Sequence, residues 1–167
     1  MIRLNPKVLD FPHMEKDSAQ YETIRRHYLF SGLDDDIFDT LAADITIESY
    51  EKGEVLFHRG DPAHAFFLIE TGHVELSLIS PEGQKKTIEV ISHDRTFAEA
   101  MVFMRISKFP VSAEALTDSV VFRIPNDSYR SLLHDNSDAC MRLLSDVCRH
   151  LHQRVQEIER LTVQNAR

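Results

Sequence analysis

Two stretches of sequence, KGEVLFHRGD at residues 52–61 and FLIETGHV at residues 67–74, decide the fold. Each places a short run of aromatic and aliphatic residues next to glycines, a pattern typical of short strands that end in sharp turns. Gly53, Gly60 and Gly72 are expected at the corners, because tight turns need a positive φ or a close approach of two backbones. The two stretches therefore predict a compact unit that consists mainly of β-strands.

The same rhythm of short apolar runs and turn residues continues from residue 45 to residue 124. Residues 74–79 and 86–91 flank the turn Pro81-Glu82-Gly83, which predicts a hairpin. About eight strands in some eighty residues favour a β-roll with tight corners. Flanking helices are predicted at about residues 19–30 with Gly32 as the C-cap, at 33–43 and at 125–134.

Length and charge limit the function classes. The 167 residues suit one domain, with residues 1–18 as a polar, loosely held arm and residues 19–135 as the β-roll unit. The N-terminus lacks the apolar stretch of a secretory signal, and no apolar run is long enough to span a membrane, so a cytoplasmic protein is expected. The net charge is −8 and no Lys/Arg cluster is dense, so this chain alone does not provide a DNA-binding face.

Residues 136–167 are predicted to form a dimerisation helix. No glycine or proline occurs from residue 139 to residue 167, and a helix of about 28 residues spans roughly 40 Å, longer than a domain of this size can cover. The alternative is an amphipathic helix that packs only on its own domain. Apolar residues spaced four, three, four, three and four apart predict a parallel coiled coil with a second copy. This seam consists of Leu144, Cys148, Leu151, Val155, Ile158 and Thr162.

Cys140 and Cys148 lie eight residues apart in this helix. That spacing corresponds to roughly 12 Å, too far for one disulfide within the chain. Both are predicted to be buried thiols.

Taken together, the glycine-punctuated strands, the short helix and the long helix resemble the cyclic-nucleotide-binding fold, and more narrowly the CRP/FNR family of transcription regulators. The resemblance covers Tyr21 to Arg167 and implies a double-stranded β-helix followed by the dimerisation helix. It also implies a C-terminal helix-turn-helix domain that binds DNA, which is absent from this chain. In such a regulator an effector shifts the dimer helices and thereby the presentation of the DNA-binding domains.

The family's effector cassette corresponds to residues 96–103 and continues through residues 109–113. By resemblance, Glu99 matches a glutamate that hydrogen-bonds the nucleotide ribose, and Ser112 matches a hydroxyl residue beside the phosphate. Ala98 stands where the family has a glycine, and Val111 stands where it has an arginine. The effector pocket is predicted to include Phe97, Ala98, Glu99, Ala100, Met101, Phe103, Val111 and Ser112.

Val111 makes cyclic AMP an unsuitable effector. A buried phosphate without a charged partner carries an uncompensated charge, and an isopropyl group cannot replace a bidentate guanidinium. Arg105 or Lys108 from the adjacent loop is the alternative partner for the phosphate. An apolar cavity for a flat hydrophobic cofactor is predicted instead, lined by Phe97, Met101, Phe103, Met104, Phe109 and Val111.

Three short motifs resemble a subgroup of the family, the dissimilative nitrate respiration regulators and the related regulators of hybrid-cluster protein. They are AHAF at residues 63–66, FAEAM at 97–101 and LHQR at 151–154. The resemblance implies that the domain binds haem and responds to nitric oxide, a small gaseous effector. The iron–sulfur chemistry of other relatives is disfavoured because residues 1–50 contain no cysteine.

Imidazole is a competent axial ligand of haem iron. The candidate ligands are His152, His150, His64 and His73, and Met101 or Met104 is the alternative sixth ligand. Two alternatives to a haem sensor remain: a nucleotide-responsive or effector-independent regulator domain, and a cupin-like metal enzyme that uses His73, Glu75 and His64. The enzyme is disfavoured, because the β-region has no His-x-His pair.

Overall fold

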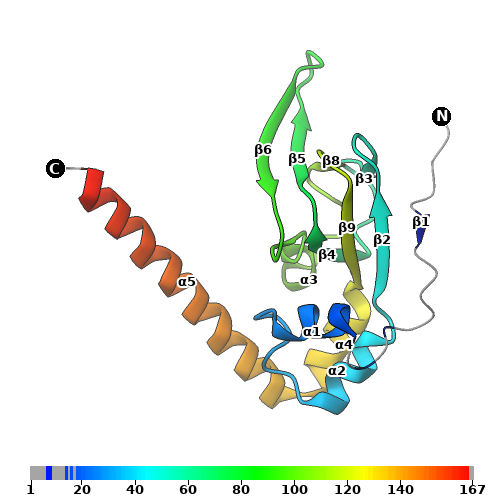
Figure 1. Ribbon diagram of the computed structural model, residues 1–167, viewed down its shortest axis with the longest axis vertical. Coiled ribbons are helices and arrows are strands. Elements are labelled where there is room, and N and C mark those ends of the chain that lie inside the picture. The colour runs from blue at the N-terminus through cyan, green and yellow to red at the C-terminus, as the bar shows by residue number, and fades with distance from the viewer. Residues whose placement is uncertain (1–6, 9–13, 15, 17, 166–167) are drawn as a thin grey trace.

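The computed structural model describes residues 7–8, 14, 16 and 18–165, and it shows a β-roll above a layer of short helices, with one long helix that projects away (Figure 1). Strands β2 to β9 lie between Thr46 and Pro125, so the expected number of strands in this region is confirmed. The strands are β1 (Lys7–Val8), β2 (Thr46–Tyr50), β3 (Val55–Phe57), β4 (Ala65–Thr71), β5 (Val74–Ile79), β6 (Lys85–Ile91), β7 (Thr96–Phe97), β8 (Ser112–Ala115) and β9 (Ser119–Pro125).

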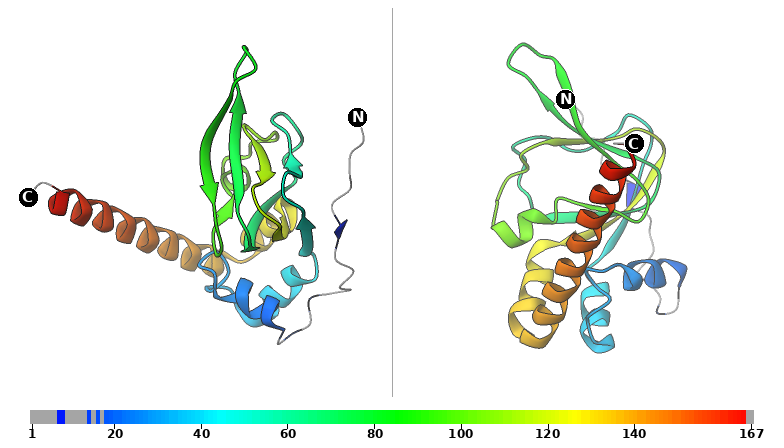
Figure 2. Two further views of the ribbon diagram at one scale, coloured as in Figure 1. Left: turned by 45° about the horizontal axis from the view of Figure 1, so that its top comes forward. Right: turned by 90° about the vertical axis from the view of Figure 1, so that its left-hand side faces the viewer.

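Two antiparallel sheets form the roll. One has the strand order β1-β2-β9-β4-β7 and the other has the order β3-β8-β5-β6. The predicted hairpin is confirmed as β5 and β6, which extend beyond the rest of the roll (Figures 1 and 2). Gly53, Gly60 and Gly72 have φ angles of 89°, 90° and 90°, as their corner positions require.

Strand β4 illustrates how alternation divides the core. Phe66 and Leu68 pack towards the helices, whereas Phe67 and Ile69 point into the roll. Because successive side chains of a strand point to opposite faces, one strand contributes to two separate apolar clusters. The larger sheet is therefore covered by helices on one face and by the second sheet on the other.

The helices at the base are α1 (Ala19–Arg26), α2 (Asp35–Ala42), α3 (Ala100–Met104) and α4 (Asn126–Asp135). Phe30 and Tyr129 are fully buried beneath the sheet, where the Tyr129 hydroxyl donates to the Leu29 carbonyl at 2.8 Å. This contact joins residues a hundred positions apart and fixes the base of the roll.

Helix α1 ends earlier than the sequence pattern predicted. It stops at Arg26, and His27 is its extended C-cap, so the C-cap role expected for Gly32 is wrong. The following turns are held by Arg25, whose guanidinium donates to the carbonyls of Phe30 and Leu33 at 2.7 Å each. Gly32 instead lets helix α5 approach, because an added Cβ would lie 3.2 Å from Arg142 Cβ.

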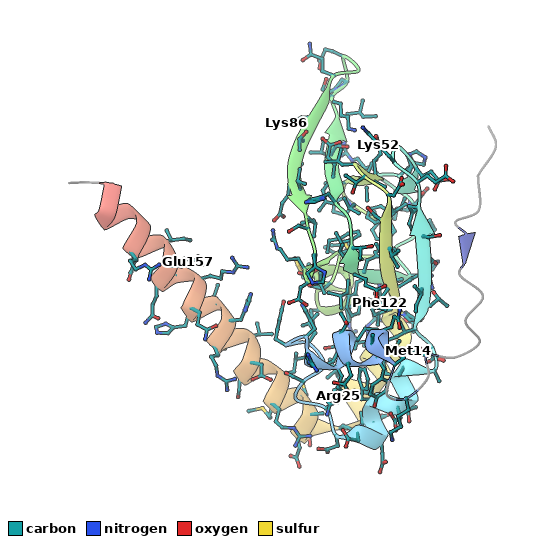
Figure 3. The ribbon with its side chains drawn as sticks, in the orientation of Figure 1. Met14, Arg25, Lys52, Lys86, Phe122 and Glu157 are labelled. Atoms are coloured by element: carbon teal, nitrogen blue, oxygen red, sulfur yellow. The ribbon has the colours of Figure 1, made fainter. Side chains whose placement is uncertain are left out.

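Helix α5 (Ser137–Asn165) is anchored to the domain near its beginning. Ala139 and Leu143 are buried, and Arg142 donates to the Gly32 carbonyl at 2.6 Å. Further along, the helix leaves the domain, and Figure 3 shows Glu157 far from the roll while Phe122 lies between the sheet and the helices. Both Cys140 and Cys148 are exposed in the single chain, so the prediction of buried thiols is not met in the protomer.

The arm predicted at residues 1–18 lies mostly outside the described residues. Where it is described, β1 pairs antiparallel with β2. Among the described residues no helix combines the length and apolarity needed to cross a bilayer.

Candidate effector site between the roll and helix α5

The interior of the β-roll is filled by phenylalanine rings. Phe57 stacks on Phe109 with ring centroids 3.7 Å apart, and it also packs against Phe67 and Phe97. Phe67 and Phe97 stack on each other at 5.1 Å. Because four aromatic side chains occupy the space between the sheets, the interior is a packed core rather than a preformed apolar cavity.

The cassette residues divide between this core and the surface. Phe97 and Met101 are buried in the core, whereas Ala100 is exposed at the start of α3. Phe103 and Met104 are 49% and 68% exposed, so they do not line the cavity that the sequence analysis expected.

Ala98 has the backbone conformation that a glycine would favour. Its φ is 65°, in the left-handed region that costs an alanine roughly 1–2 kcal/mol. The turn at Ala98 is therefore one that a glycine would adopt without strain.

The two residues expected beside a phosphate are half-buried in the isolated chain. Val111 precedes β8 and offers no charge. The Ser112 hydroxyl accepts a hydrogen bond from the Arg59 backbone N–H at 2.9 Å. Arg105 has φ 53° as the C-cap of α3, and Lys108 pairs with Pro62 in an isolated bridge. Ser112 thus already has a role inside the roll.

A polar cavity of about 330 Å³ lies where the roll meets α5, and we call it the junction cavity. Its lining comes from four places: residues 26–28 at the end of α1 and just after it, residues 94–96 before and in β7, Glu99, and the α5 residues His150 and Arg154. Its volume falls at the lower end of the range for small-molecule sites. Of the cassette, Thr96 and Glu99 reach this cavity.

His27 is one of several residues of this cavity that the sequence did not single out, together with Arg26, Tyr28, Asp94, Arg95 and Arg154. It is 6% exposed, and burial lowers its pKa to about 4. Its Nδ1 accepts the Leu29 backbone N–H at 3.3 Å, so the ring is a neutral imidazole with its proton on Nε2. Because the predicted helix over residues 19–30 extended past this position, no periodic signal marked His27.

Tyr28 links the roll to the long helix. Its ring stacks almost parallel on His150, with centroids 4.6 Å apart and an interplanar angle of 8°. Burial raises the pKa of the Tyr28 hydroxyl, and the Thr96 side chain opposes this shift. This single aromatic residue therefore contacts both walls of the junction cavity.

Both signs of charge line the cavity. Burial raises the pKa of Glu99, which favours its protonated form. Arg95 pairs with Glu89 at 2.6 Å, and Arg26 and Arg154 make only exposed ion pairs with their helix neighbours. The guanidiniums of Arg26 and Arg154 are thus available to an anionic group in the cavity.

The four candidate histidines do not come together. His150 is half-buried and lines the junction cavity. His152 is exposed two positions along the helix, with its Nε2 3.1 Å from Gln156. His64 and His73 are exposed at the two ends of β4. Within the described part of the chain, no group of three or more His, Cys, Asp or Glu side chains could hold a metal ion.

The predicted seam of α5 presents its apolar side chains to solvent in the single chain. Leu151, Val155 and Ile158 are 63%, 45% and 63% exposed, and Leu144 and Cys148 are exposed as well. The side chain of Thr162 lies outside the described residues. An exposed apolar row of this length is typical of a surface that another chain covers.

Known proteins resemble this chain along most of its length. The cyclic nucleotide-binding domain family matches residues 47–136. The crystal structure of DNR from Pseudomonas aeruginosa is 37% identical, with 92% of this chain and 67% of that chain covered and a TM-score of 0.86. The sensor domain of the transcriptional regulator DNR is 36% identical over 84% of this chain and 93% of that chain, with a TM-score of 0.71.

A curated relative, the cyclic AMP receptor protein of Thermus thermophilus, is 24% identical over 83% of this chain. The match covers 64% of that protein, so the chain spans slightly less than two thirds of this relative's length. The expectation of a regulatory domain rather than an enzyme is confirmed by these relatives. In the cupin-like alternative Glu75 was a metal ligand, but its carboxylate pairs with Lys85 at 2.5 Å while His73 is exposed.

The β-roll and the long helix agree with these matches, and the resemblance stated from the sequence is confirmed. The chain belongs to the cyclic nucleotide-binding domain family, as a sensor domain of the CRP/FNR type.

Proposed function

We propose that this chain is the effector-sensing and dimerisation part of a cytoplasmic CRP/FNR-type transcription regulator that binds haem in the junction cavity and responds to nitric oxide. It acts as a parallel homodimer through α5, and it binds DNA through a helix-turn-helix domain that follows this helix. The observation that carries the proposal is the position of the junction cavity. His150 and Arg154 of α5 face residues of the roll across it, so an occupant contacts the element that has to move.

The donor set of the cavity suits the iron and the propionates of haem, whereas its polar lining does not suit the apolar macrocycle. His150 offers a half-buried imidazole, the usual protein ligand of haem iron. Arg26 and Arg154 suit the two propionate groups, because guanidinium pairs strongly with carboxylate. When bound, haem iron would supply the site that binds nitric oxide. His150 is therefore the preferred ligand among the four histidines predicted from the sequence.

The attachment of α5 supports transmission of a signal. Beyond its first two turns, the contacts of this helix with the domain include the Tyr28–His150 stack. Movement of His150 towards a ligand would break its stack on Tyr28. Binding then favours one position of α5 over another by the difference in its affinity for the two. The hinge lies near Gly32 and Arg142, where the helix is held by hydrogen bonds.

Two observations disfavour the alternative of a nucleotide-responsive regulator. The roll interior, where the cassette resemblance implies a cyclic nucleotide, is occupied by the four stacked phenylalanines. Val111 itself offers a phosphate no charge, which leaves Arg105 and Lys108 of the adjacent loop as its alternative partners. An effector-independent relative stays an alternative that the following experiment decides.

The test is reconstitution of the haem-free protein with ferrous haem, followed by absorption spectroscopy before and after nitric oxide. We expect a saturable Soret band with one haem per protomer that shifts when nitric oxide binds. His150→Ala should weaken haem binding at least about tenfold, whereas His152→Ala, which is exposed on the same helix, should match the wild type. Circular dichroism of both variants checks that the fold is retained.

Three results would contradict the proposal: no stoichiometric band, a band that does not respond to nitric oxide, or equal losses in the two variants. Calorimetric titration with cyclic AMP on the same preparation tests the runner-up. Tight and specific binding of cyclic AMP in this titration would establish the nucleotide-responsive function in place of the haem sensor.

A further inference from the structure

A second cavity, of about 710 Å³, lies between helices α2 and α4 at the base of the molecule, and we call it the α2/α4 groove. It shares no lining residue with the junction cavity. The proposed sensing function therefore gives this groove no role.

The floor of the groove is apolar. Leu41 is buried, and Ile37 and Leu132 are half-buried. Exposed Thr40 and Ser131 lie on the walls, each four residues after another lining position. The i, i+4 spacing on both helices means that each presents one continuous face to the groove.

Four carboxylates and no basic side chain line this groove. Asp36 and Asp44 lie at the two ends of α2, and Asp127 and Asp135 lie at the two ends of α4. Asp127 pairs with Arg130 at 2.8 Å and Asp135 with His134 at 3.1 Å. Within the described residues, Asp36 and Asp44 have no ion pair.

Helix electrostatics explain two of these residues but not the others. Asp36 and Asp127 lie in first turns, where the helix dipole stabilises negative charge. Asp44 follows α2 and Asp135 ends α4, where the dipole disfavours a carboxylate. The negative charges of Asp44 and Asp135 therefore weaken the fold slightly. A role outside folding accounts better for the presence of these two carboxylates.

We propose that the α2/α4 groove docks a basic amphipathic helix of a partner protein. The apolar floor would bury the helix's apolar stripe, as in other helix-in-groove complexes. Asp36 and Asp44 are eight residues apart, and so are Asp127 and Asp135. Eight residues correspond to about 12 Å along a helix. A partner helix with Lys or Arg about two turns apart on both flanks of a Leu or Ile stripe matches this arrangement.

The probe is a fluorescently labelled synthetic helix with a leucine stripe flanked by lysines, and a scrambled peptide of the same composition is its control. Anisotropy titrations measure the Kd of each peptide for the full chain. We expect the amphipathic peptide to bind at least about tenfold more tightly than the scrambled one. Asp44→Asn/Asp135→Asn should weaken its binding about tenfold without loss of thermal stability, because both charges oppose a helix dipole.

Two further variants separate docking from general charge attraction. Glu157→Gln/Glu159→Gln removes the same net charge from the exposed part of α5 and should leave the Kd within about twofold of the wild type. Thr40→Arg places a cation in the middle of the groove at an exposed position and should abolish specific binding. Equal binding of the two peptides, or equal losses from the groove and α5 neutralisations, would overturn the proposal.

Discussion

The roll interior and the junction cavity share the segment from Thr96 to Glu99 but differ in almost every physical property. Phe97 turns inward into a stack of phenylalanine rings, whereas Glu99 turns towards a polar cavity with two imidazoles and three guanidiniums. A packed apolar core contributes stability and resists the entry of a ligand. A polar cavity between the roll and the weakly joined helix α5 contributes less stability but leaves room for a ligand.

The largest effect should come from emptying the interior. Phe57→Ala removes the ring that contacts three others, and we expect a loss of about 3–5 kcal/mol in the free energy of unfolding. Phe103→Ala deletes the same atoms from a half-exposed position on α3 and should cost about 1 kcal/mol. Urea denaturation of the two variants gives the comparison. Similar losses would mean that the interior is not the dominant core.

The next effect concerns the exposed row on α5. Leu151→Glu should weaken the dimer at least about hundredfold, or about 2.7 kcal/mol, because a charge would be buried in the seam. Gln153→Glu adds a charge two residues away on the outer face of the same helix and should leave the dimer unchanged. Sedimentation equilibrium measures both. A dimer that survives Leu151→Glu would show that another face mediates assembly.

A smaller effect should appear as a pH dependence on the junction side. His27 titrates at about 4 in the folded chain and near 6.5 when unfolded, chiefly because it is buried. The unfolded chain therefore binds more protons between these values, and stability is lost as the pH falls from about 6.5 towards 4. We expect a loss of about 2 kcal/mol in the free energy of unfolding over this range.

The pH dependence is measured by urea denaturation of the haem-free protein at a series of pH values. His27→Gln should flatten the profile between pH 6.5 and 4, and His64→Gln, which alters an exposed ring, should not. An unchanged slope in His27→Gln would mean that another group titrates.

The smallest effect should come from the turn between the two regions. Ala98→Gly relieves a left-handed alanine, and we expect a gain of about 0.5–1 kcal/mol after the added freedom of the unfolded chain is subtracted. Ala100→Gly, two residues later in helix α3, should instead destabilise by about 1 kcal/mol. Thermal unfolding distinguishes the two by the sign of the change. A loss in both would show that the Ala98 conformation carries no strain.

Patterns that depend on neighbouring residues were predicted well from the sequence. The alternation in β4, the corner glycines and the β5–β6 hairpin follow from local sterics, because each needs only the conformational preference of a few residues. The heptad spacing of α5 likewise placed an apolar row, and the structure shows that row exposed.

The candidate site was predicted less well, for a physical reason. The sequence grouped Phe103 and Met104 with Phe97 because they are close along the chain, yet α3 turns them outward. It also treated His150 and His152 alike, although helix geometry places only one of them on the side of the roll.

The sequence by itself determined a β-roll with sharp corners, a long amphipathic helix and a cassette that lacks the arginine for a phosphate. Only the tertiary structure decided that the roll interior is closed by aromatic packing and that His27, Tyr28 and His150 meet at one cavity. His27 and Tyr28 are neighbours in the sequence, whereas His150 lies more than a hundred positions further along the chain. Their meeting depends on where α5 leaves the domain, which long-range packing sets and no local pattern encodes.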